Sequence, residues 1–188
     1  MVLINDNSKV LQVGDPMPHF TLPATDESTI DSKALDAPVL AIVFTCNHCP
    51  YAQAYEDRLK ALYNEFATKG VQFILICSND AVNYPEDAFE EMKKRAMEQQ
   101  YQFPYCQDES QDIARAYGAL CTPHTFVFDR ERRLQYKGQV DDNWKNPNAV
   151  KRATLRDAIA ALVAGSEPAV KEANAIGCSI KWKPSVLS

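Results

Sequence analysis

The sequence has little that would direct it to a nucleic acid or a membrane. Its 25 acidic and 20 basic residues are interspersed, contain no basic run, and give a net charge of −5. Partners with phosphate backbones or anionic headgroups usually require a basic surface, so we expect no nucleic-acid and no membrane partner. The longest apolar run, Pro38 to Phe44, is too short to span a bilayer, and the N-terminus lacks the pattern of a secretory signal. We therefore expect a cytoplasmic protein.

Internal repeats and low-complexity segments are also absent, which excludes solenoid and disordered classes. The 188 residues are 46% hydrophobic and 24% charged, an ordinary composition for a soluble globular protein. A chain of this length can bury one sizeable core. We expect a single domain over 1–188, with a core at about 13–165 and a C-terminal extension at 166–188.

Apolar runs alternate with helical segments along the chain. The runs 38–44 and 71–77 are uniformly apolar, which is typical of strands buried on both faces. Strands separated by helices, then a hairpin and a terminal helix, indicate an α/β domain with a mixed sheet. We predict strands at 18–22, 38–44, 71–77, 125–129 and 134–140, and helices at 50–68, 85–100, 110–117 and 150–164.

The chain has six cysteines, and two of them form a CxxC motif. Six cysteines would allow three structural bridges in a secreted chain, but this sequence shows no secretory signal. In that context the pair Cys46 and Cys49, separated by Asn47 and His48, indicates redox or metal chemistry. A structural zinc site usually needs four ligands, and neither a second CxxC nor an HxxxH supplies the rest. Redox chemistry is therefore favoured, without a cofactor, and metal binding stays open as an alternative.

The CNHC segment directly follows the most hydrophobic predicted strand and opens a predicted helix. Unpaired N–H groups and the positive end of the helix dipole stabilise a thiolate there, so we expect the pKa of Cys46 to fall. Cys46 can then attack a disulfide, and Cys49 can release the mixed disulfide by forming an internal bridge. His48 is a candidate tuning group. We expect Cys46 to be the more exposed sulfur and Cys49 the more buried one.

A second element, Thr122-Pro123, directly precedes the predicted strand 125–129. A proline before a strand is usually only a strand entry, but beside a CxxC pair it suggests a cis peptide bond. We predict that the Thr122–Pro123 bond is cis and that Pro123 packs against the two sulfurs. The backbone edge there would hold a substrate polypeptide as an added strand.

Together these motifs resemble the thioredoxin superfamily. The segments VGDPMPHFTL at 13–22, FTCNHCPYA at 44–52, SND at 78–80, YPED at 84–87 and GCSIKW at 177–182 are similar to a peroxiredoxin-like redoxin group. The resemblance implies a thioredoxin-like fold, a central mixed sheet flanked by helices, with an N-terminal redoxin-type strand extension. It also implies Cys46 as the exposed nucleophile, Cys49 as its resolving partner and Pro123 as the cis proline.

Two departures from that resemblance concern the site. Peroxiredoxins carry PxxxTxxC, whereas here Thr45 adjoins Cys46 and residues 41–44 hold no proline. The acid that thioredoxins bury in the strand before CxxC is replaced by an apolar stretch around Leu40. The peroxidatic pattern is thus broken, and disulfide exchange is favoured over peroxide reduction.

Three functions remain open from the sequence. The first is a thiol–disulfide oxidoreductase acting on protein or small-molecule disulfides and recycled by a dithiol reductant. The others are a thiol peroxidase acting through Cys46 and a redox-sensing or metal-binding module without turnover. Candidate auxiliary residues are Thr45, His48, Thr122, Cys121 and Cys178.

Overall fold

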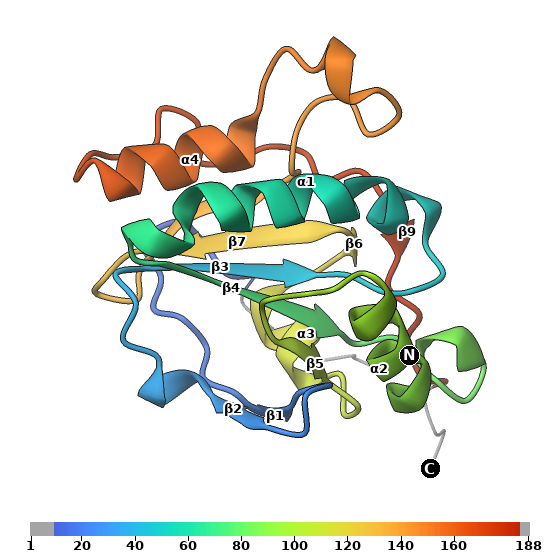
Figure 1. Ribbon diagram of the computed structural model, residues 1–188. Coiled ribbons are helices and arrows are strands. Elements are labelled where there is room, and N and C mark those ends of the chain that lie inside the picture. Colours follow the sequence, from blue (N-terminus) through green and yellow to red (C-terminus); the bar gives the residue numbers. More distant parts are fainter. Residues whose placement is uncertain (1–9, 185–188) are drawn as a thin grey trace, which may run out of the picture.

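Figure 1 shows the computed structural model, which describes residues 10–184. Residues 1–9 and 185–188 of the expected domain lie outside the described residues. No helix in the described part of the chain is long and apolar enough to cross a membrane.

A five-stranded mixed sheet forms the centre of the molecule. Its order is β5-β4-β3-β7-β8, with bounds Tyr105–Gln107, Val71–Cys77, Val39–Phe44, His124–Phe128 and Leu134–Gly138. β3 pairs in parallel with β4, which pairs in parallel with β5, while β7 is antiparallel to both β3 and β8. The predicted mixed α/β sheet is confirmed.

Helices and an N-terminal hairpin cover the two faces of this sheet (Figure 1). One face buries Val39, Ala41 and Val43 of β3 against α1 (Pro50–Phe66) and α4 (Thr154–Val163), together with Met92 of α2 (Phe89–Glu98). The other face buries Leu40, Ile42 and Phe44 against α3 (Asp112–Tyr117) and the segment around β1 (Thr21–Pro23) and β2 (Thr29–Asp31). Because both faces of β3 are covered, its sequence is apolar at every position.

Several predicted helices are shorter than the sequence pattern indicated. The helix predicted over 85–100 is broken at Ala88, whose ψ of 151° is extended, and only Phe89–Glu98 is α-helical. The helix predicted over 50–68 ends at Phe66 and is followed by Gly70, whose φ of 82° is left-handed. The last two predicted helices begin late, at Asp112 and Thr154. Short 3-10 helices occupy Ser32–Ala34, Ala67–Lys69, Pro85–Asp87 and Pro147–Ala149.

The C-terminal segment crosses the end of the sheet as an extended chain. We call residues 170–183 the strap. Its first part is joined to β8, where the Lys137 N–H donates to the Lys171 carbonyl and the Ala173 N–H donates to the Lys137 carbonyl, each at 3.0 Å. Its second part contains β9 (Cys178–Ser179), which pairs antiparallel with β6 (Cys121–Thr122). The sequence pattern indicated little regular structure here, because a two-residue strand leaves no periodic signal.

Candidate active site

The CNHC segment lies where β3 ends and α1 begins. β3 stops at Phe44, Cys49 has extended dihedral angles at the N-cap, and Pro50 is the first helical residue. Proline suits that position because its fixed φ is helical and its missing N–H would have no partner there. The helix N-terminus therefore lies beside the two sulfurs, as predicted, and its dipole favours negative charge there.

The peptide bond between Thr122 and Pro123 is cis, as predicted. Thr122 contacts both sulfurs: its Oγ1 lies 3.4 Å from Cys46 Sγ, and its carbonyl oxygen accepts from Cys49 Sγ at 3.1 Å. Pro123 is itself buried. The structure thus brings Cys46, Cys49 and the cis-proline turn together at one end of the sheet.

Both sulfur-bearing residues are covered. Cys46 is 2% exposed and Cys49 is 0% exposed. Since both residues are buried, the prediction of an exposed nucleophile at Cys46 is wrong. The reason is tertiary: Thr122 packs on one side of Cys46, and Asp87 approaches from another.

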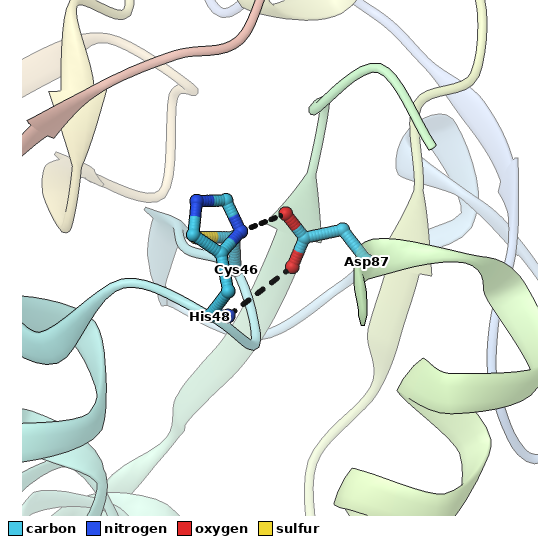
Figure 2. A group of neighbouring side chains, drawn as sticks. All are labelled: Cys46, His48 and Asp87. Carbon is cyan, nitrogen blue, oxygen red and sulfur yellow. Dashed lines mark hydrogen bonds and ion pairs between the residues drawn. The ribbon is translucent and has the colours of Figure 1, made fainter. Parts of the chain in front are cut away.

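Asp87 is the residue that the sequence analysis missed. It is fully buried, and its carboxylate accepts from the Asn47 N–H at 2.7 Å, from His48 Nδ1 at 2.6 Å and from Asn79 Nδ2 at 2.8 Å. Figure 2 shows the carboxylate facing the His48 ring and the His48 backbone N–H. The YPED segment contains Asp87, but the sequence pattern predicts that this residue lies in a helix over 85–100. The break at Ala88 accompanies this inward position.

The loop between the two cysteines is fixed by further polar contacts. The Tyr105 hydroxyl donates to Asn47 Oδ1 at 3.0 Å, and Asn47 Nδ2 donates to the Glu86 carbonyl at 2.8 Å. The His48 ring stacks on Tyr84, with centroids 5.4 Å apart. Since these contacts tie the loop both to β5 and to the segment 84–86, the sulfurs are held in a preorganised arrangement.

The two sulfurs control each other's ionisation. The hydrogen bond with Cys49, then burial and the negative charge of Asp87, raise the pKa of Cys46, while the Thr122 hydroxyl lowers it. The same bond between the sulfurs lowers the pKa of Cys49. The pair therefore loses its first proton readily and its second with difficulty. The prediction of a lowered pKa for Cys46 is contradicted, because a buried thiol beside a thiolate and a carboxylate resists ionisation.

One proton thus remains on the reduced pair, and the contacts offer it two positions. On Cys46 it is donated to the Cys49 sulfur, which is the arrangement that these pKa directions favour. On Cys49 it is donated to the Thr122 carbonyl, and Thr122 Oγ1–H can then donate to a Cys46 thiolate. The second arrangement is the one in which Cys46 is a nucleophile.

Residues 13–137 match the AhpC/TSA family. The chain belongs to the AhpC/TSA family. It is 41% identical to an uncharacterized conserved protein from Geobacillus kaustophilus, over 95% of this chain and 96% of that one, with a TM-score of 0.89. It is 35% identical to a hypothetical protein from Sinorhizobium meliloti 1021, over 94% of this chain and 98% of that one, with a TM-score of 0.87.

A more distant structure supports the fold assignment. The thioredoxin domain of a thiol-disulfide oxidoreductase from Bacteroides vulgatus is 18% identical, over 68% of this chain and 88% of that one, with a TM-score of 0.59. No curated protein matches the chain. The predicted thioredoxin-like fold and the resemblance to the redoxin group of the thioredoxin superfamily are confirmed.

Within this AhpC/TSA-family site, three side chains have the chemistry of metal ligands. The ligand atoms of Cys46, His48 and Asp87 all lie within 4.8 Å of one another. However, the Asp87 carboxylate already accepts three close hydrogen bonds, from Asn47, His48 and Asn79. A metal would have to displace some of them, so the donor set fits a hydrogen-bonded anion better than a cation ligand.

The remaining auxiliary candidates occupy different places. Thr45 is buried, and its backbone N–H donates to the Ile76 carbonyl at 2.9 Å, which ties the end of β3 to β4. Cys121 is buried in β6, with its sulfur 3.7 Å from the Pro123 carbonyl. Cys178 is in β9 and pairs directly with Thr122. All six cysteines are free thiols.

The backbone edge predicted to hold a substrate strand is already occupied. Thr122 pairs with Cys178, and Cys121 pairs with Ser179, so the chain's own strap takes the place of an added strand. The prediction of an open docking edge at the cis proline is therefore wrong for this conformation. The reason is a pairing between segments that are remote in sequence.

Proposed function

We propose that the protein is a thiol–disulfide oxidoreductase in which Cys46 attacks and Cys49 resolves. The observation that carries this proposal is the placement of both sulfurs at the N-terminus of α1, each within contact of Thr122 before the cis proline. Substrates would be disulfides of proteins or small molecules, and a dithiol would recycle the enzyme. A reducing compartment such as the cytoplasm would supply that dithiol.

The reaction begins when the shared proton moves from Cys46 to Cys49. The Cys46 thiolate then attacks one sulfur of the substrate disulfide, forming a mixed disulfide and releasing the other sulfur as a thiolate. Cys49 next gives its proton to that leaving thiolate and attacks Cys46 Sγ. The internal Cys46–Cys49 disulfide forms, and the second substrate sulfur leaves. Two electrons have passed to the substrate, and an external dithiol restores the reduced pair.

The test is reduction of insulin disulfides with a dithiol as the electron source. Cys46→Ser should abolish turnover, whereas Cys49→Ser should stall as a mixed disulfide that can be isolated without reductant. Cys106→Ala is the matched control, because Cys106 is buried in β5 on the opposite face of the sheet from the pair. Full insulin turnover by Cys46→Ser would refute the proposal.

Peroxide reduction is the second candidate, and the burial of the pair favours it. With Cys46 2% exposed, a small electrophile reaches its sulfur more easily than a folded protein does. The Cys46 thiolate would attack the peroxide O–O bond, giving a sulfenic acid and releasing water or an alcohol. Cys49 would then displace water to form the disulfide. Peroxide consumption far above that of a free thiol, with no reaction towards disulfides, would reverse the ranking.

A further inference from the structure

The strap approaches the active site more closely than ordinary strand pairing requires. A Cβ atom added at Gly177 would lie 2.1 Å from the Thr122 carbonyl oxygen, so only glycine permits this approach. That oxygen is the one that accepts from Cys49 Sγ. The backbone before Cys178 and the sulfur of Cys49 therefore meet at the same atom.

Cys178 is accordingly placed beside the resolving cysteine. Cys178 pairs with Thr122, whose carbonyl oxygen accepts from Cys49 Sγ, and its side chain packs against the core cluster that contains Cys46 and Cys49. The two thiols also shift each other's pKa, which lowers that of Cys49 and raises that of Cys178. The three cysteines differ in access, because Cys178 is partly exposed while Cys46 and Cys49 are 2% and 0% exposed. A reductant that approaches from solvent meets Cys178 first.

The strap holds this position from both sides. Before Cys178 it is joined to β8 through Lys171 and Ala173. After Cys178, Ile180 is 3% exposed and its N–H donates to the Leu120 carbonyl, while the Lys181 N–H donates to Asn79 Oδ1 at 2.9 Å. A thiol held in place by such anchors reacts with its neighbour at a high effective concentration.

We propose that Cys178 is a third redox thiol, which takes over the disulfide from the buried Cys46–Cys49 pair and presents it to the dithiol reductant. The proposal rests on the proposed function of Cys46 and Cys49. It accounts for two features together, the burial of the pair and the occupation of the cis-proline edge by the strap.

The transfer is a thiol–disulfide exchange without net oxidation. The Cys178 thiolate attacks Cys49 Sγ, the Cys49–Cys178 bond forms, and the Cys46–Cys49 bond breaks. Cys46 leaves with the electron pair and takes up the proton that Cys178 gave up. The dithiol then attacks the partly exposed Cys178 sulfur, Cys49 leaves, and the second thiol of the reductant closes its own disulfide.

In the reduced protein, burial and the bond with Cys49 raise the pKa of Cys178 to about 11. Oxidation of the pair removes the Cys49 thiolate and so favours ionisation of Cys178.

The first experiment maps the disulfide directly. The Cys46→Ser variant is treated with one equivalent of diamide, and its peptides are identified by mass spectrometry without reduction. We expect Cys49–Cys178 as the main internal disulfide. Adding Gly177→Ala in the same background should lower its yield several-fold, because the new methyl group forces the strap away from Thr122. A main bridge from Cys49 to Cys121, or no bridge to Cys178, would overturn the proposal.

The second experiment measures recycling with thioredoxin as the dithiol, a folded reductant that meets the partly exposed Cys178 before the buried pair. Reduction of the oxidised Cys178→Ser variant should be about tenfold slower or more than that of the wild type, while Cys106→Ala matches the wild type. Thermal unfolding of each variant checks that the fold is intact. If Cys178→Ser is recycled at the wild-type rate while insulin reduction still depends on Cys46, the role of Cys178 is refuted and the proposed function is not. Insulin reduction by Cys46→Ser refutes the proposed function instead.

Discussion

Asp87 provides the sharpest test of the electrostatics of the site. Its buried carboxylate lies no more than 4.8 Å from the ligand atom of Cys46. For a unit charge at that distance, an effective dielectric constant of about 20 gives an interaction of about 3.5 kcal/mol with a thiolate, or about two and a half pKa units. The hydrogen bond from His48 Nδ1 to the carboxylate, at 2.6 Å, offsets part of this interaction energy. We therefore expect Asp87→Asn to lower the pKa of Cys46 by about one to two units.

The measurement is best made where Cys46 titrates alone, in a Cys49→Ser background. Ultraviolet absorbance of the thiolate is followed against pH, with and without Asp87→Asn. The absorbance of the other cysteines is subtracted with the matching Cys46→Ser variant, because their pKa values are raised as well, to about 11 for Cys121 and Cys178 and to about 12 for Cys77 and Cys106. An unchanged or higher pKa for Cys46 in the variant that carries both Cys49→Ser and Asp87→Asn would refute this reasoning.

Two further predictions concern stability. Burial, then the charge of Lys137, lowers the pKa of His124 from 6.5 to about 4, and its Nδ1 accepts the Leu120 N–H at 3.3 Å. The unfolded chain binds this proton first as the pH falls, so the contribution of His124 is complete above pH 6.5 and is lost towards pH 4, a change of roughly 3 kcal/mol. Urea unfolding at a series of pH values should show that the free energy of unfolding depends less on pH in His124→Asn, which keeps an acceptor but does not titrate. An equal pH dependence in the variant and the wild type would contradict this prediction. Phe126 is 0% exposed, with its ring centroid 5.4 Å from that of Tyr117 and 5.7 Å from that of Phe44. Phe126→Ala should lower the free energy of unfolding by about 3–5 kcal/mol. The control Val82→Ala, at an 84% exposed position, should lower it by less than about 0.5 kcal/mol. Similar losses for both variants would refute the assignment of Phe126 to the core.

The sequence by itself determined the elements whose signals are local. The apolar runs of β3 and β4 and the CxxC pair with Pro50 at the start of α1 are each read from a few neighbouring residues. The same holds for Thr122-Pro123 before a strand. These signals placed Cys46 and Cys49 at a helix N-terminus and predicted the cis bond, which the structure confirms.

Only the tertiary structure decided which distant groups surround the sulfurs. Asp87 reaches Asn47 across 40 residues of sequence, from a segment whose composition indicated an ordinary helix. Cys178 meets Thr122 through a two-residue strand that has no periodicity to recognise. Both contacts depend on how separate segments pack against the end of the sheet, and a local pattern carries no record of that packing. The ionisation of Cys46 combines both sources, since the bond with Cys49 lies within the CxxC motif, whereas Asp87 and Thr122 come from elsewhere in the chain.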